Sequence, residues 1–479
     1  MKAYKILVFI LSIIVLLVFL CIFFPVKGIP FGDRRLFFPT LEEIMIREKH
    51  LTAREKLAIL ESGLRLQFVK DSIENAERMA YDDSIHVYMQ FFNRHPARFY
   101  LPNNDLSFFD SLFYRLDNCV ENNEIIHILH YGDSQIEADR ITGLIRQKLQ
   151  ENFGGNGPGL IPVIQPIPSV SVAQTASENM ERFTIAGTFV NETEHNRYGV
   201  LGQTTEIIEN GTISVATRNN KTTFDNVKDF SKVRVFVSRH SPDFSATLIT
   251  ANNDSITRSL PDESSQMRTL TWDFKKPIRR LELYFSGDAE ISALALDGNA
   301  GVAVDNIPLR GSSGTFFTGI DVNTFLPVLK ELNIGLIILQ FGGNSIPYIK
   351  STAAIDEYTK GIAKQINHFQ TIYPAAKILF IGPSDMSTME NGRLRTYPYL
   401  KETVQAIMET ALNNGAAFWN LYEVMGGENS MIEWVRNNPP WASPDYIHLT
   451  EKGAAKIAEM FYESLMIYYH YTQFMNNYK

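Results

Sequence analysis

The sequence predicts an α/β protein with an inserted all-β domain and an N-terminal transmembrane helix. Apolar strand patterns alternate with helical patterns over residues 123–165 and again over 298–479. Between them, over 166–297, short β-branched or alternating segments are separated by turn residues at short intervals, which is typical of an all-β sandwich. A long apolar run, from Ile6 to Phe24, precedes the α/β regions and the β region. With 479 residues, the chain is long enough for two or three domains.

Composition argues against two classes of function. The chain has 45 Lys and Arg residues against 53 Asp and Glu residues, so it lacks the basic surface that nucleic-acid binding requires. The two cysteines, Cys21 and Cys119, form neither a C-x-x-C pair nor a Cys/His cluster, so we expect no zinc site and no disulfide between them.

The first 27 residues predict a cytoplasmic tip and a signal anchor. Lys2 and Lys5 precede an uncharged apolar run from Ile6 to Phe24, which is long enough to cross a bilayer. No small-residue cleavage site precedes Pro25, so we expect an uncleaved anchor. Because positive charge stays on the cytoplasmic side, the rest of the chain is expected on the extracytoplasmic, periplasmic side of a single-pass membrane protein.

Residues 28–122 predict a helical stalk. Thr40 is a candidate helix N-cap, and helical periodicity continues from Leu51 through Met79. A further amphipathic helix is expected over Phe108 to Leu116. No specific feature supports a binding role for this region.

The first part of the α/β domain contains a strand, a polar turn and a helix. Ile125 to Leu129 reads as a short buried strand that stops at Gly132-Asp133-Ser134, and a helix is expected from about Glu137 to Phe153. The glycines of 154–159 lack the Lys-Ser/Thr of a P-loop, so they are interpreted as a helix stop.

The inserted region is predicted to be a jelly-roll-like sandwich over residues 166–297. Such modules often bind carbohydrate through exposed aromatic side chains, and Trp272, Phe274 or Tyr284 could do so here. The alternative is that these three side chains belong to the core of the sandwich.

The second part of the α/β domain resumes the alternation. Gly335 to Phe341 is a near-continuous apolar run, as expected for a parallel strand buried on both faces. The other predicted strands are Gly301–Asp305, Lys377–Ile381 and Ala417–Leu421, and the predicted helices are Phe325–Leu332, Ala353–Tyr373, Tyr399–Asn414 and Thr450 to about Tyr469.

Three of these strands end in polar loops that contain glycine. Ser134 follows the first, Gly311 the second and Asn344 the third, and the carboxyl ends of parallel strands meet at one edge of the sheet. A late loop adds Asp445 and His448, three residues apart.

These residue types together fit nucleophilic catalysis. A serine at neutral pH needs an adjacent base, which His448 could supply, and Asp445 could orient that imidazole. The oxyanion formed on attack could be held by the backbone N–H groups of Ser134 and Gly311 and by the Asn344 amide. Each motif by itself also fits a non-catalytic role, as a helix cap, a surface histidine or a turn.

The motifs resemble the SGNH/GDSL hydrolase superfamily. Gly132-Asp133-Ser134 matches its first block, Gly342-x-Asn344 its third and Asp445-x-x-His448 its fifth. Gly311 resembles the glycine of the second block, although Gly314 is an alternative. The resemblance implies that Ser134, His448 and Asp445 are catalytic, with an oxyanion hole of Ser134, Gly311 and Asn344.

The first block, His-Tyr-Gly-Asp-Ser-Gln, precedes Asp139-Arg140 and a glycine-rich loop and is followed by a β insertion. This form resembles the peptidoglycan O-acetylesterase-like branch. The resemblance implies a flavodoxin-like three-layer fold, an acyl-enzyme intermediate, no metal and no cofactor.

We therefore expect a membrane-anchored serine esterase that removes O-acetyl groups from an envelope polysaccharide such as peptidoglycan. The alternatives are an O-acetyltransferase using the same triad and a catalytically silent glycan-binding protein. His127 and His130 are expected to be packed or hydrogen-bonded on the first strand. Gln135, Asp139 and Arg140 are expected either at the pocket rim or on the surface of a helix.

Overall fold

The computed structural model describes residues 81–477 except 189, 221, 222 and 265, and before them only 17, 19, 29–31 and 34–36. The unit formed by residues 1–52 contributes one short antiparallel hairpin, β1 (Ile29–Phe31) with β2 (Arg34–Leu36). The predicted signal anchor and the predicted stalk helix through Met79 lie outside the described residues, apart from residues 17 and 19. Within the described ranges, every helix is too short or too polar to span a bilayer.

A six-stranded sheet forms the centre of the α/β domain, and the α/β prediction is confirmed. Its first five strands in space are parallel, and the sixth pairs antiparallel with its neighbour. Numbered along the chain, the parallel strands have the order 2-1-3-4-5, which is the flavodoxin-like order. In spatial order the strands are β16 (Gly301–Pro308), β4 (Ile125–Gly132), β17 (Ile334–Gln340), β18 (Lys377–Ile381), β21 (Ala417–Trp419) and β3 (Phe99–Tyr100).

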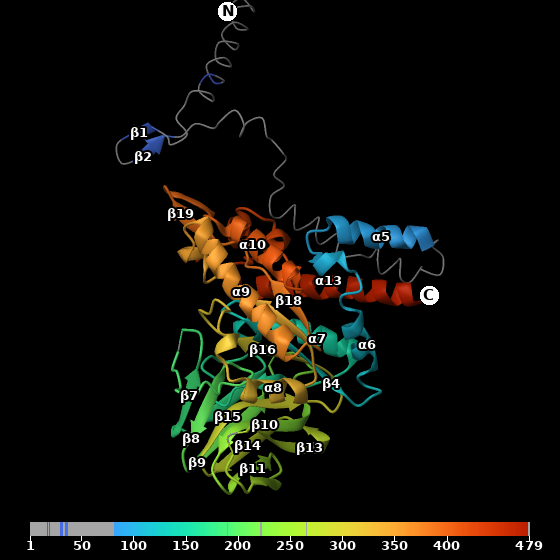
Figure 1. Cartoon of the computed structure of the whole chain (residues 1–479), viewed down its shortest axis with the longest axis vertical. Coiled ribbons are helices and arrows are strands. Elements are labelled where there is room, and N and C mark those ends of the chain that lie inside the picture. The colour runs from blue at the N-terminus through green and yellow to red at the C-terminus, as the bar shows by residue number, and fades with distance from the viewer. Residues whose placement is uncertain are drawn as a thin grey trace, which may run out of the picture. The chain divides into compact units, whose positions relative to one another are not determined.

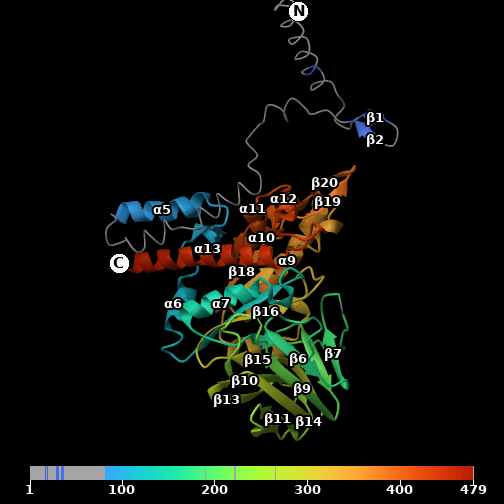
Figure 2. The same cartoon turned by 180° about the vertical axis from the view of Figure 1, so that it is seen from behind.

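Helices cover both faces of this sheet because its strands are apolar on both sides. On β4, Ile126 and Ile128 pack with one set of helices, whereas Leu129 and Tyr131 face the other. In both views α13 runs beside α7 (Figures 1 and 2). The first set comprises α5 (Tyr81–Arg94), α6 (Asp110–Asn118), α7 (Thr142–Phe153) and α13 (Glu451–Asn477), and the second α8 (Val322–Glu331), α9 (Thr352–Ile372) and α10 (Leu400–Asn413).

The inserted region forms a sandwich of two antiparallel sheets. One sheet has the order β13-β10-β15-β8-β7, with β5 (Gly159–Ile161) also paired to β15, and the other has the order β12-β11-β14-β9-β6. β5, which pairs with a strand of the sandwich, lies before residue 166, the predicted start of the insertion. The remaining strands are β6 (Val172–Ala176), β7 (Met180–Thr184), β8 (Gln203–Ile207), β9 (Asn210–Thr217), β10 (Phe230–His240), β11 (Phe244–Thr250), β12 (Ser255–Leu260), β13 (Arg268–Ile278), β14 (Arg280–Ser286) and β15 (Ala289–Asp297).

The aromatic residues of the insertion mostly serve its core. Trp272 is 1% exposed and donates its indole N–H to the carbonyl of Ile256, so it cannot stack on a sugar. Phe274 packs partly buried against the same core. Tyr284 alone of the three is exposed, at 43%, and its hydroxyl donates to Glu282.

The sandwich is packed onto the α/β domain rather than tethered to it. Every residue of β15 is buried, because one face of its sheet covers the sandwich core and the other covers the α/β domain. On that second face, Phe236 and Ala293 belong to the same apolar cluster as Leu129 and Tyr131. Tyr131 also donates its hydroxyl to the carbonyl of Val200, at 2.7 Å.

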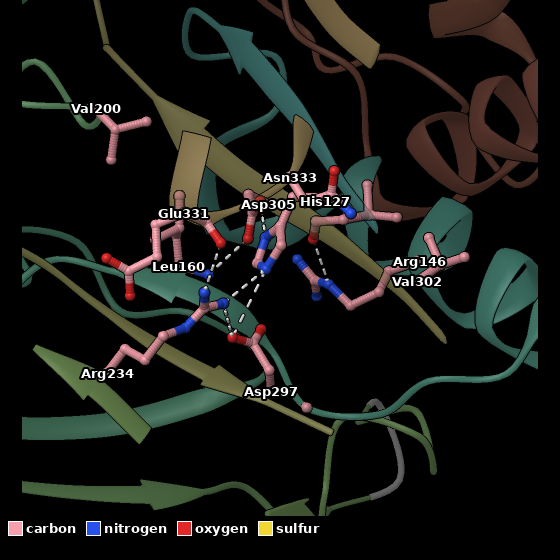
Figure 3. A network of polar contacts seen from close by, with 12 residues as sticks. His127, Arg146, Leu160, Val200, Arg234, Asp297, Val302, Asp305, Glu331 and Asn333 are labelled. Atoms are coloured by element: carbon pink, nitrogen blue, oxygen red, sulfur yellow. Dashed lines mark hydrogen bonds and ion pairs between the residues drawn. The ribbon is translucent and has the colours of Figure 1, made fainter. Parts of the chain in front are cut away.

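A buried polar network joins the two domains at the same place (Figure 3). His127 of β4 contacts Asp305 of β16 through Nδ1, at 2.8 Å, and Arg234 of β10 through Nε2, at 3.0 Å. Arg234 also donates to Asp297, at 2.7 Å, and to the carbonyl of Glu331, at 3.1 Å. His127 is fully buried, as the sequence analysis expected of a packed histidine.

The helix predicted from Glu137 to Phe153 is interrupted. A 3₁₀ turn, η2 (Glu137–Asp139), comes first, and α7 begins only at Thr142. Ala138 and Asp139 have φ values of 58° and 68°, which lie outside the helical region. The break turns the buried Asp139 carboxylate toward Arg146, whose Nη1 donates to it at 2.6 Å.

Other differences follow from contacts that are distant in sequence. α13 continues eight residues beyond the predicted Tyr469, because its last turns pack on α5, with Tyr471 5.5 Å from Tyr88 between ring centroids. The hairpin β19 (Ser387–Glu390) with β20 (Arg393–Thr396) was not predicted.

Candidate active site

Ser134 lies at the point where the strand order of the sheet reverses. It follows β4, whose neighbours β16 and β17 continue the chain in opposite directions across the sheet. Such switch points open a crevice beyond the carboxyl ends of the strands, where ligands bind. The turn after β4 presents the Ser134 hydroxyl to the late loop, and its Oγ lies 2.9 Å from Nε2 of His448.

The loop before α13 carries both other candidate catalytic side chains. Oδ2 of Asp445 lies 2.8 Å from Nδ1 of His448, and its Oδ1 accepts the backbone N–H groups of Ile447 and His448. Burial opposes ionisation of Asp445, but the hydrogen bonds from His448 and Ile447 hold the pKa of this carboxyl below its usual value. The structure thus brings Ser134, His448 and Asp445 into one continuous chain of hydrogen bonds.

The side chains of Gln135 and Arg140 connect the turn that carries Ser134 to the loop that carries His448. Gln135 donates its side-chain amide to the carbonyl of Ile447, at 2.8 Å. Arg140 donates to the carbonyls of Ser134, at 2.6 Å, and Leu449, at 3.3 Å. Both side chains therefore connect the two loops. This role is not predictable from the sequence, because nothing in the local pattern pairs positions about 310 residues apart.

Asn344 is held firmly beside the serine turn. Its Nδ2 donates to Oδ2 of Asp133, at 3.1 Å, and to the carbonyl of Ser312, at 3.0 Å. Oδ1 of Asp133 in turn accepts the backbone N–H of Gln135, at 2.9 Å. Burial raises the pKa of Asp133 to about 6, against the opposing effect of the Gln135 hydrogen bond. Both amide hydrogens of Asn344 are thus engaged, and an oxyanion would have to share one of them.

The loop after β16 offers two glycines, and their backbone N–H groups differ in availability. Gly311 and Gly314 both have φ of 79°, a conformation that favours glycine. The N–H of Gly314 donates to the hydroxyl of Ser312, at 3.1 Å. Among the residues described by the structure, no acceptor binds the N–H of Gly311 or that of Ser134. Hydrogen bonding therefore favours Gly311 over Gly314 as an oxyanion donor.

His130 and Asp139 lie near the site but are committed to structural contacts. His130 is buried between Gln340 and Thr142, and burial lowers its pKa to about 4. Asp139 binds Arg146 and Ser171. In the part of the chain that the structure describes, no group of three or more His, Cys, Asp or Glu side chains is arranged to hold a metal ion.

Comparison with known proteins identifies the fold. No protein-family model matches the chain, and no curated protein is significantly similar to it in sequence. Among solved structures, it is similar to a peptidoglycan O-acetylesterase, with a TM-score of 0.61 and 20% identity over 75% of this chain and 96% of that one. The shared fold thus spans almost the whole of that enzyme.

Two further matches are weaker. A family two carbohydrate esterase from Cellvibrio japonicus matches with a TM-score of 0.24 and 10% identity over 63% of this chain and 99% of that one. An acetyl xylan esterase matches with a TM-score of 0.24 and 14% identity over 34% and 81% of the two chains. Scores this low add nothing to the fold assignment.

Proposed function

We propose that this protein is a serine esterase that removes O-acetyl groups from an envelope polysaccharide such as peptidoglycan. The observation that carries the proposal is the chain of hydrogen bonds from Ser134 through His448 to Asp445, at the switch point of the sheet. The fold shared with a peptidoglycan O-acetylesterase supports the choice of substrate class.

The proposed reaction has two halves. Ser134 Oγ bonds to the acetyl carbonyl carbon while His448 Nε2 takes its proton, and the sugar oxygen then leaves with that proton. Water, deprotonated by His448, releases acetate from the acyl-enzyme. Asp445 holds the imidazole with its proton on Nδ1 and stabilises the imidazolium that forms.

The oxyanion of each half-reaction needs donors that are already in place. The free N–H groups of Ser134 and Gly311 could supply two, and the Asn344 amide a third. Asp133 and Ser312 keep that amide pointing in one direction, which reduces the reorganisation needed when negative charge develops.

The direct test is Ser134→Ala, measured as acetate release from O-acetylated peptidoglycan and hydrolysis of 4-nitrophenyl acetate. We expect a loss of about 10⁴- to 10⁶-fold with an unchanged unfolding temperature, since removal of a nucleophile abolishes the acyl-enzyme. Undiminished turnover in the variant would refute the proposal. So would a wild-type protein that binds glycan but cleaves no ester.

The same assay separates hydrolysis from acetyl transfer. When acetyl donor and glycan acceptor are supplied together, an esterase yields free acetate, whereas a transferase yields newly acetylated glycan. We expect acetate.

We also propose that the apolar run from Ile6 to Phe24 anchors the protein in a membrane, with the catalytic domain on the extracytoplasmic side. The support is its length and the preceding Lys2 and Lys5. The full chain should resist alkaline extraction from membranes, and a chain lacking residues 1–27 should not. Release of both by alkali would contradict the anchor.

A further inference from the structure

A cleft lies between the inserted sandwich and the α/β domain, beside the Ser134 turn. Its empty volume, open mouth included, is about 650 Å³. The α/β domain contributes η2 and the end of β16, and the insertion contributes β7, the start of β8 and the segment after β5. The insertion therefore forms part of a pocket wall.

Two walls of the cleft continue directly from the serine turn. The backbone N–H of Glu137, a lining residue, donates to the carbonyl of Ser134, at 3.4 Å. The N–H of Leu309, just after the end of the neighbouring strand β16, donates to the carbonyl of Gly132, at 2.8 Å. The cleft wall is thus adjacent to the turn that carries Ser134.

The charged side chains of the cleft leave one positive charge without a partner. Arg310 forms a bidentate ion pair with the carboxylate of Glu137, so these two charges offset each other. Arg182 of β7 donates its Nε–H to the side-chain oxygen of Gln203. Within the residues described, no carboxylate lies within ion-pair distance of Arg182, and its two terminal nitrogens have no acceptor in the protein.

This guanidinium is also partly withdrawn from water. Burial lowers the pKa of Arg182, and no acidic neighbour opposes the shift. A partly desolvated charge without an ionic partner is less favourable than a fully hydrated one. A planar carboxylate would relieve that cost, because a guanidinium can donate two parallel hydrogen bonds to it.

The other lining groups suit a sugar ring. Pro162 and Ile167 offer apolar surface for the C–H face of a pyranose, and the Gln165 amide can pair with hydroxyls. The cleft thus combines apolar contact, a neutral hydrogen-bonding group and a single unpaired cation.

We propose that this cleft binds the carboxylate of an acidic sugar residue, either the acetylated residue itself or the one next to it, with Arg182 as the ion-pair partner of the carboxylate. This inference rests on the proposed esterase function and narrows its substrate to acidic polysaccharides. The carboxylate can come from a hexuronate or from a lactyl ether on an amino sugar, since both present the same planar anion.

The test compares each of two O-acetylated polymers with its carboxyl-reduced form. One is acetylated alginate, and the other is acetylated peptidoglycan stripped of its peptides by an amidase, which frees the lactyl carboxylate. The readout is the ratio of kcat/KM for the intact polymer to that for the reduced one. Loss of charge-assisted hydrogen bonds costs about 10- to 100-fold, so wild type should favour at least one intact polymer by that factor.

Arg182→Gln should bring that ratio close to one, mainly through KM, and Arg182→Lys should give an intermediate ratio. The matched control is Arg268→Gln, which removes an exposed arginine from β13 outside the cleft and should leave the wild-type ratio. Binding of the unacetylated acidic glycan to Ser134→Ala, with and without Arg182→Gln, checks the cleft independently of turnover. Unfolding temperatures confirm that each variant is folded.

The outcomes separate this inference from the esterase proposal. If wild type hydrolyses acetyl esters but treats intact and reduced polymers alike, the carboxylate inference is wrong and the esterase stands. If Arg182→Gln keeps the wild-type preference, the inference is also wrong. If nothing is hydrolysed, the esterase proposal fails. In that case weaker binding of the acidic glycan on loss of Arg182 would still support the cleft, and unchanged binding would overturn it.

Discussion

Among the residues that the structure describes, two His–Asp pairs share the same Nδ1–Oδ2 distance but lie in opposite environments. Nδ1 of His448 lies 2.8 Å from Asp445, and Nδ1 of His127 lies 2.8 Å from Asp305. The first pair sits on a loop with its side chains 37% and 47% exposed, whereas the second is fully buried between two domains. A carboxylate at hydrogen-bond distance from a histidine is therefore not by itself a sign of catalysis.

The group at the other ring nitrogen distinguishes the pairs. Nε2 of His448 faces the Ser134 hydroxyl, whose proton it can accept and return. Nε2 of His127 faces Arg234, which can only donate, so this nitrogen accepts a hydrogen bond and the ring N–H points toward Asp305. The buried pair joins the sandwich to the sheet, and the exposed pair is available for chemistry.

Of substitutions in these two pairs, truncation of the exposed carboxylate should have the largest effect on activity. Asp445→Ala removes the group that orients His448, and we expect kcat to fall by about 10⁴-fold. The unfolding free energy should change by less than about 1 kcal/mol, because the lost contacts lie on a partly solvated loop. Ester hydrolysis and urea unfolding measure the two quantities. A fall in activity that only matched a loss of folded protein would contradict the assignment.

Truncation of the carboxylate of the buried pair should lower the stability of the protein rather than its activity. Asp305→Ala leaves His127 without its carboxylate and the N–H of Leu160, which donates to Asp305 at 2.7 Å, without an acceptor. Because both groups are buried, we expect a loss of about 3 to 5 kcal/mol in unfolding free energy. Activity per folded molecule should stay near that of wild type. If Asp305→Ala stayed fully stable, the network would not be what holds the two domains together.

A third carboxylate, Asp133, is buried like Asp305 but lies at the site like Asp445. Its pKa is about 6 in the folded protein, against 3.8 for an unperturbed group. Because the folded state binds this proton more tightly than the unfolded state, the group stabilises the protein below about pH 4 and loses that contribution as pH rises through 6. A shift of two pKa units corresponds to about 3 kcal/mol.

Asp133→Asn cannot ionise. As pH rises from 4 to 8, its unfolding free energy should therefore increase by about 2 to 3 kcal/mol relative to that of wild type. Urea unfolding at the two pH values provides the measurement. The control is Asp445→Asn: because the pKa of Asp445 is lowered, its contribution to stability is lost only as pH falls below about 4, so this variant should show little trend between the two pH values, and of opposite sign. Parallel pH profiles for Asp133→Asn and wild type would show that Asp133 is not destabilised by ionisation.

Much of the α/β fold followed from local sequence. The apolar run from Gly335 to Phe341 and the glycine-containing turns after successive strands predicted both the sheet and the edge at which polar groups gather. Asp445 and His448 lie three residues apart, so their contact depends on one loop. The break after Glu137 was not predictable, because the positive φ values of Ala138 and Asp139 depend on a distant packing environment.

The sequence by itself determined which residue types stand at the ends of which strands, because hydrophobic periodicity and turn chemistry are local properties. Only the tertiary structure decided what those residues face. Gln135 and Arg140 form hydrogen bonds from the serine turn to a loop about 310 residues away. Trp272 is buried in the sandwich core and is not available to a sugar. Arg182 acquires its place in a cleft because two domains are packed together, which no pattern within either domain encodes.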